Sequence, residues 1–206
     1  MALVMLLNSF LLVLRGQSFR GNGSHEYLPL VLNSYARMIV APLRHAGHAV
    51  DVAIAASEEV CEPSSVRRFR QQVESAFGAQ TLVSFVVAPT HNQADGMRLA
   101  MHVLRGSAAR RRYDAYILSR LDLQLRVDVT QWNCSLTDRV NFASICGPRD
   151  FDGCVNDVFI TLPHAELMAF EAGIGHPAAA DCDCESERRR QHGCAPIPFA
   201  RRCFDD

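Results

Sequence analysis

Four short apolar runs alternate with amphipathic runs across the first 120 residues, and this alternation constrains the fold more than any other feature of the sequence. The apolar runs have the length of buried strands and lie at residues 11–14, 50–55, 81–88 and 116–118. Between them, apolar residues recur at helical spacing over residues 27–45, 66–77 and 92–104. Strands that alternate with helices in this way form parallel sheets covered by helices, so the sequence predicts an α/β domain.

The pattern changes after Asp122. Apolar and polar residues alternate over residues 123–129, as in a half-buried strand, and further short strands are expected at 142–146 and 155–162. Pro163 is expected to begin a helix that runs through Ala172, and the sequence is loop-like from Gly173 onward. We therefore expect one mostly parallel α/β domain over residues 1–173, followed by a tail rich in Cys and Arg over residues 174–206.

Composition excludes some classes of function. All 21 basic residues are Arg, and the absence of Lys excludes Schiff-base catalysis and any P-loop lysine. The formal net charge is −1, so the chain has no overall basic excess of the kind that nucleic-acid-binding domains carry. We expect no nucleic-acid partner.

The amino-terminal segment is apolar over residues 3–14, apart from Asn8 and Ser9. A spanning helix needs about 20 apolar residues. The segment also lacks a preceding basic residue and a small-residue cleavage site, so it is a poor signal peptide. The favoured interpretation is a buried strand at residues 11–14, and a short membrane anchor is the alternative.

Three groups of polar residues are candidates for chemistry. Arg120 and Asp122 directly follow a predicted strand, at the edge where open α/β sheets bind ligands. There Asp122 either coordinates Mg²⁺ or Mn²⁺ or pairs with Arg120 in a structural salt bridge. Asn156 and Asp157 open an apolar run, where Asp157 is either a general base or part of a simple turn. The third group, residues 15–20, follows the first strand; its arginines suit phosphate oxygens and its glycine permits close backbone approach.

Taken in order, these segments resemble a poorly characterised group of GT-A-type glycosyltransferase-like proteins. The resemblance covers about residues 11–173. It is carried by RGQSFR (15–20), a helix with SY (34–35) and PL (42–43), GHAVDV (47–52), YDAYILSRLDL (113–123) and VNDVF (155–159). It implies a Rossmann-like GT-A-type sheet that binds a nucleotide-diphosphate sugar. The implied donor-binding residues are Arg15, Gly16, Gln17, Ser18, Arg20 and Arg120.

The resemblance also implies catalytic residues and a metal. Asp122 occupies the place of the Asp-x-Asp metal motif of the GT-A fold, which implies a catalytic Asp122 that binds Mn²⁺ or Mg²⁺. Asp157 falls in the acceptor-side segment that often supplies the base. The chain departs from the motif because its first position is Arg120, so either Asp122 binds the metal alone or Arg120 replaces the charge of the metal.

The implied function is the transfer of a sugar from a nucleotide-diphosphate donor to a hydroxyl group of a glycan or protein acceptor. An alternative from another class is a non-catalytic α/β module that binds a nucleotide or a partner, as an inactive relative would. Binding of nucleotides with and without Mn²⁺ discriminates between the two.

Eight cysteines and two sequons bear on the compartment. Cys182, Cys184, Cys194 and Cys203 with His192 are either a Zn²⁺ site or disulfide partners, and the spacing favours disulfides. Asn22 and Asn133 begin glycosylation sequons. Together these features predict a disulfide-bonded glycoprotein of the secretory pathway, in the lumen of the endoplasmic reticulum or Golgi or secreted.

Overall fold

The chain folds around one mixed, mostly parallel sheet. The computed structural model describes residues 8–17, 24–57, 63–90, 93–142, 159–175 and 201–202. Within these ranges the strands are β1 (Ser9–Gln17), β2 (Ala49–Ser57), β3 (Leu82–Ala88), β4 (Ala115–Arg120), β5 (Asn141–Phe142), β6 (Phe159–Pro163) and β7 (Arg201–Arg202). Their spatial order is β3-β2-β1-β4-β6-β5-β7. The first four strands are parallel, whereas β6 is antiparallel to β4 and β5. The predicted α/β class and mostly parallel sheet are confirmed.

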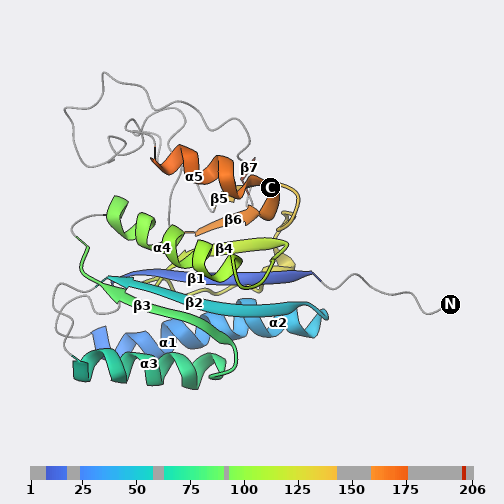
Figure 1. The fold of residues 1–206 in the computed structure, drawn as a ribbon. Coiled ribbons are helices and arrows are strands. Elements are labelled where there is room, and N and C mark those ends of the chain that lie inside the picture. The colour runs from blue at the N-terminus through green and yellow to red at the C-terminus, as the bar shows by residue number, and fades with distance from the viewer. Residues whose placement is uncertain are drawn as a thin grey trace, which may run out of the picture.

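Helices cover both faces of this sheet (Figure 1). One face carries α1 (Ser24–Tyr35), α2 (Ala41–His45) and α3 (Pro63–Phe77), and a π-helical turn, η1 (Ala36–Val40), joins α1 to α2. The other face carries α4 (Gln93–Ala108) and α5 (Leu167–Gly175). Two short 3-10 turns, η2 (Val129–Gln131) and η3 (His164–Glu166), complete the elements of the described ranges. None of the helices in these ranges is long and apolar enough to span a membrane.

Alternating side chains of the sheet divide the core into two layers. Leu12 and Leu14 of β1 pack on the side of α1 and α3, where Tyr35 and Phe69 are buried. Leu11 and Val13 face the other side and pack with the apolar stripe of α4. The members of that stripe that the helical spacing predicts, Met97, Ala100, Met101 and Leu104, are all buried. The amphipathic pattern of residues 92–104 therefore predicted the buried face of α4 correctly.

The strand expected at residues 123–129 is wrong. This segment is irregular and ends in η2. Both sides of β4 are already occupied, by β1 and by β6, so the segment meets no free strand edge. The backbone N–H of Leu125 instead donates to Ser34 Oγ over 3.0 Å. Leu123 and Leu125 pack against the core beneath the sheet, which accounts for the alternation of apolar residues without a strand.

Other boundaries differ in smaller ways. The single helix expected over residues 27–45 consists of α1, η1 and α2, and Pro163 ends β6 instead of beginning a helix. Part of the strand expected at 142–146 lies in β5, and part of the one expected at 155–162 lies in β6; the rest of both lies outside the described residues. In the tail, the described residues 201–202 form β7, which pairs in parallel with β5.

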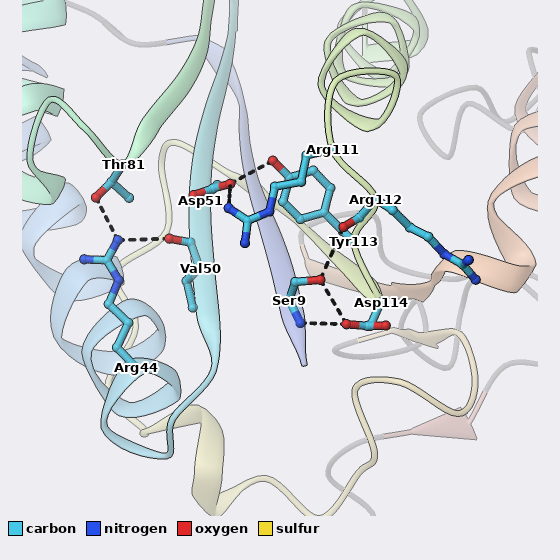
Figure 2. Close-up of polar contacts among 9 residues, drawn as sticks. All are labelled: Ser9, Arg44, Val50, Asp51, Thr81, Arg111, Arg112, Tyr113 and Asp114. Carbon is cyan, nitrogen blue, oxygen red and sulfur yellow. Dashed lines mark hydrogen bonds and ion pairs between the residues drawn. The ribbon is translucent and has the colours of Figure 1, made fainter. Parts of the chain in front are cut away.

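Side chains form hydrogen bonds and an ion pair near the amino-terminal ends of the parallel strands (Figure 2). Arg44 of α2 donates to the carbonyl of Val50 over 2.9 Å and to Thr81 Oγ1 over 2.7 Å. Nearby, Asp51 accepts from Arg111 over 3.0 Å and from the hydroxyl of Tyr113 over 2.9 Å. The arginine cluster after α4 therefore contributes an ion pair with β2 at this edge. The carboxyl-terminal ends of the parallel strands lie at the opposite end of the sheet.

Candidate functional site

The candidate site lies at the carboxyl-terminal ends of β1, β2 and β4. These strands are parallel neighbours, so their last residues meet at one edge of the sheet. Gln17 at the end of β1 is in register with Ser57 at the end of β2, and Arg15 is in register with Arg120 at the end of β4. This is the edge at which open α/β sheets bind ligands.

Arg15 and Arg120 belong to the same face of the sheet. Side chains alternate along a strand, and Val13 of β1 and Leu118 of β4 both pack in the layer beside α4. Two residues further along each strand, Arg15 and Arg120 therefore face the α4 side as in-register neighbours. Arg15 is buried, with 3% of its surface exposed, whereas 19% of the Arg120 side chain is exposed. Two arginine side chains therefore leave neighbouring strand ends on the same face of the sheet.

Arg120 forms a two-point ion pair with Asp122. Its Nε donates to Asp122 Oδ1 over 2.9 Å, and its Nη2 donates to Oδ2 over 2.5 Å. Two parallel charge-assisted bonds fix the relative orientation of the guanidinium and carboxylate planes. The salt-bridge interpretation of Asp122 matches this geometry. The three charges at the strand ends, Arg15, Arg120 and Asp122, sum to +1.

Gly16 follows Arg15 near the end of β1, and its backbone has a φ of +103°. Residues with a side chain rarely adopt this backbone conformation, which explains the choice of glycine here. A Cβ atom at Gly16 would meet no heavy atom within 4 Å, so the backbone at the end of β1 has open space beside it. The predicted close approach to the backbone is sterically available at this position.

Buried hydroxyl groups for which the sequence predicted no role in the site lie beneath the same strand ends. Tyr35, the last residue of α1, is fully buried, and its hydroxyl is 2.6 Å from Ser119 Oγ and donates to the carbonyl of Arg120 over 2.8 Å. Burial raises the pKa of Tyr35 well above its ordinary value, against the smaller opposing effect of the Ser119 hydrogen bond. On β2, the hydroxyl of Ser57 is hydrogen-bonded to that of Thr90. Helical spacing identified Tyr35 only as part of an apolar helix face.

Several predicted site residues are not placed by this structure. Ser18, Arg20 and Asp157 lie outside the described residues, as do Asn156 and the cysteines of the tail. The backbone of Gln17 is described, in register with Ser57. The structure therefore brings together Arg15, Gly16, Arg120 and Asp122. Their predicted roles in donor and metal binding remain predictions.

The described residues do not form a ready-made divalent-cation site. Both carboxylate oxygens of Asp122 accept hydrogen bonds from Arg120. Within the ranges that the structure covers, His, Cys, Asp and Glu side chains nowhere gather in a group of three or more that could hold a metal. Mn²⁺ and Mg²⁺ take about six oxygen ligands, and among the described strand-end residues Asp122 alone could supply a carboxylate, in competition with its pairing to Arg120.

Among solved structures, the chain is similar to glycosyltransferases. The first is a mutant of Drosophila β1,4-galactosyltransferase 7 in complex with manganese, UDP-Gal and xylobiose, at 13% identity and a TM-score of 0.39. That match covers 81% of this chain but only 52% of the galactosyltransferase, so the chain spans about half of its length.

The second is the galactosyltransferase LgtC in complex with donor and acceptor sugar analogues, at 10% identity and a TM-score of 0.38, covering 95% of this chain and 87% of LgtC. An active-site mutant of LgtC matches at 10% identity with a TM-score of 0.36. Superpositions of this extent assign no residue and no activity to this chain. Neither a family model nor a curated protein matches the sequence.

Proposed function

We propose that this chain transfers a glycosyl group from a nucleoside-diphosphate sugar to a hydroxyl acceptor. The observation that carries the proposal is the pair of in-register arginines, Arg15 and Arg120, at the ligand-binding edge of the sheet. Guanidinium groups recognise phosphate oxygens with directed, charge-assisted hydrogen bonds. The sequence motifs around these arginines resemble those of GT-A-type proteins, and this resemblance is the reason to propose a sugar nucleotide as the ligand that carries the diphosphate.

The proposed donor lies over the end of β1, where the open space beside Gly16 admits a ligand close to the backbone. Arg120 is the partly exposed guanidinium and contacts the diphosphate, together with Gln17, Ser18 and Arg20 of the segment that follows β1. Arg15 is buried beside Arg120 and contributes positive charge without being exposed to solvent. Fixed positive charge at this position stabilises the diphosphate as it leaves, when its negative charge increases.

In the proposed reaction, the bond between the anomeric carbon and the diphosphate oxygen breaks, and a bond between that carbon and the acceptor oxygen forms. The electron pair of the broken bond stays with the diphosphate, beside the guanidinium groups. The acceptor proton passes to a base, for which the sequence proposes Asp157. That aspartate lies outside the described residues, so its role rests on the motif alone.

Asp122 is the proposed protein ligand for Mn²⁺ or Mg²⁺, but cation binding there competes with its ion pair to Arg120. When bound, such a cation would neutralise diphosphate charge and act as a Lewis acid. We propose that the guanidinium groups neutralise the diphosphate while the carboxylate of Asp122 is paired with Arg120.

The experiment is calorimetric titration of UDP, GDP and CMP, each in EDTA and in MnCl₂. We expect one nucleoside diphosphate to bind, and Arg120→Gln to weaken it at least tenfold, because a charge-assisted hydrogen bond contributes about 1.5–3 kcal/mol. Arg105→Gln is the matched control, since Arg105 pairs with Glu171 of α5 over 2.7 Å. Absence of binding by every nucleotide in both buffers, or an equal loss in both variants, would contradict the proposal.

A second candidate function is nucleotide binding without turnover. The observation that favours it is the closed Arg120–Asp122 pair, which leaves no carboxylate among the described strand-end residues disposed for catalysis or metal binding. Sugar-nucleotide hydrolysis distinguishes the two candidates. A protein that binds the nucleotide tightly and releases no free sugar above the rate without enzyme fits the second candidate.

We also propose a secretory-pathway lumen as the compartment. Asn133, which begins a sequon, is exposed, and we propose that Cys134 beside it is one of the cysteines that form disulfides. Glycosylation and disulfide formation both belong to that compartment. Thiol titration of the denatured, unreduced protein tests this proposal, since eight free thiols would contradict it.

A further inference from the structure

The carboxyl-terminal end of β4 is held from below by the last residue of α1. Tyr35 Oη donates to the carbonyl of Arg120 over 2.8 Å. A phenol has one proton, so the 2.6 Å contact with Ser119 requires Ser119 Oγ to donate to Tyr35 Oη. The resulting chain of donors runs from Ser119 through Tyr35 to the backbone of Arg120, and both side chains that make it are completely buried.

Packing alone does not explain these two hydroxyls. Tyr35 lies in the apolar layer on the α1 side of the sheet, where a phenylalanine ring would fill nearly the same volume. A hydroxyl in such surroundings is costly unless it is hydrogen-bonded. What the hydroxyls add is a fixed position for the Arg120 carbonyl, the point at which the chain leaves β4 and turns toward Asp122. The same carbonyl also accepts from the N–H of Leu123 over 3.5 Å.

The neighbouring residue of α1 reinforces the same segment. Ser34 Oγ accepts from the N–H of Leu125 over 3.0 Å and donates to the carbonyl of Val31 over 2.7 Å. Two consecutive residues at the end of α1 thus fix both ends of the stretch 120–125, which contains the Arg120–Asp122 ion pair. The π-helical turn η1 begins at the next residue, Ala36, and turns of this kind are uncommon and often lie at functional sites.

We infer that Tyr35, assisted by Ser119, is a positioning residue that holds the Arg120–Asp122 pair in the geometry that binds the diphosphate. This inference rests on the proposed function for its ligand. The structural part of the inference does not rest on that function, because the hydrogen bond to the Arg120 carbonyl holds the backbone from which the Arg120 side chain extends, whether or not a ligand is bound. Because Tyr35 is completely buried, it acts on the site through Arg120 and not by direct contact with a ligand.

The test compares Tyr35→Phe with Tyr113→Phe. Tyr113 is an equally apt control because it is also buried and its hydroxyl also makes a hydrogen bond, but to Asp51 at the opposite edge of the sheet. Both variants lose one buried hydroxyl. The first measurement is the Nε–H resonance of Arg120 in the ligand-free protein, assigned as the signal that Arg120→Lys removes. The second is the affinity for UDP in EDTA.

We expect the Nε proton of Arg120 to exchange with water at least fivefold faster in Tyr35→Phe and at an unchanged rate in Tyr113→Phe. UDP affinity should fall at least fivefold in the first variant and stay within twofold in the second. An unchanged Nε signal in Tyr35→Phe, or equal changes in both variants, would overturn the inference. So would a changed signal with unaltered UDP affinity.

The design separates this inference from the proposed function. If UDP fails to bind the wild-type protein, the proposed function is contradicted, and the Nε signal still decides whether Tyr35 positions Arg120. If Tyr35→Phe does not fold, Ser119→Ala replaces it, because that change removes one bond to the phenol and leaves the bond to the Arg120 carbonyl. In Ser119→Ala, a smaller change in the same direction in both measurements would support the inference. An unchanged result in either measurement would overturn it.

Discussion

Gly16 gives the end of β1 a backbone conformation that other residues rarely adopt. Its φ of +103° is strained for any residue with a side chain, and the space around its Cβ position is open. We therefore expect Gly16→Ala to destabilise the protein by about 1–2 kcal/mol through the backbone alone, with no steric clash. Urea denaturation measures this loss of unfolding free energy.

Gly106 provides the matched control. It lies in the last turn of α4, has no positive φ, and has equally open space at its Cβ position. Gly106→Ala should stabilise the protein by about 0.5 kcal/mol, because alanine favours helix and restricts the unfolded chain. The same sign of effect at both glycines would contradict the conformational explanation.

Two roles are proposed for Asp122, the ion pair with Arg120 and the binding of Mn²⁺ or Mg²⁺, and one substitution affects both. Asp122→Asn keeps a side-chain oxygen that accepts a hydrogen bond from Arg120 but removes the negative charge that repels the diphosphate, so we expect UDP to bind several-fold more tightly in EDTA. Any gain in affinity on adding MnCl₂ should disappear, because the proposed metal ligand is gone. Calorimetric titration of wild type and variant in the two buffers measures both effects. Weaker binding in EDTA would indicate that the intact ion pair is what recognises the diphosphate.

The sequence predicted some of these residues and not others, for a physical reason. Arg15, Gly16, Arg120 and Asp122 are polar or conformationally special residues at the ends of apolar runs, so the pattern itself exposes them. Tyr35 lies on the apolar face of the predicted helix and Ser119 directly follows the apolar run at 116–118, so nothing local in the sequence indicates that their hydroxyls meet. That their hydroxyls meet depends on the packing of α1 against β4, across 84 residues of chain.

At the scale of elements, sequence periodicity predicts what a segment buries better than what it pairs with. The parallel strands and α4 followed from the pattern because each is a single element with one or two buried faces. Residues 123–129 have the period of a strand and bury Val129, yet form no strand, because no edge is free beside β4. A strand needs a partner as well as a pattern, and the partner is not local in sequence.

The entry into β1 gives a pH-dependent prediction. Asp114 Oδ2 accepts from the N–H of Ser9 over 2.7 Å and from its hydroxyl over 2.9 Å (Figure 2). The backbone hydrogen bond, assisted by that hydroxyl and by the charges of Arg112 and His164, lowers the pKa of Asp114 despite partial desolvation. A carboxyl with a lowered pKa stabilises the fold above its unfolded pKa of about 3.9, and this contribution is lost as the pH falls through the folded value.

Asp114→Asn should therefore destabilise the protein at pH 7 and progressively less below about pH 3.9. The side chain is exposed, so screening limits the loss at pH 7 to about 1 kcal/mol or less, which corresponds to about 2–4 °C in Tm. Urea denaturation of wild type and variant from pH 7 to pH 3 measures the difference. A difference that stays constant across this range would show that the charge of Asp114 has no part in it.

At the scale of the whole molecule, the sheet concentrates stability at the strands that carry the candidate site. β1 pairs with β2 along all nine of its residues and with β4 along six, and residues 10–15 are buried. β3 lies at the edge of the sheet, and every residue in it is only half-buried. The arginines of the site thus extend from the most enclosed strands of the described fold, where backbone positions are held from both sides.

Amide hydrogen exchange tests this distribution. Peptides from β1 and β4 should exchange only through global or near-global unfolding, whereas β3 exchanges through local opening at least tenfold faster. The expectation follows from pairing and burial, because opening β3 breaks one strand interface and opening β1 breaks two. Exchange followed by mass spectrometry over minutes to days resolves the two classes. Equal protection of β1 and β3 would mean that the sheet opens as one unit. The backbone of Arg15 in β1 would then be no more rigid than that of the edge strand β3.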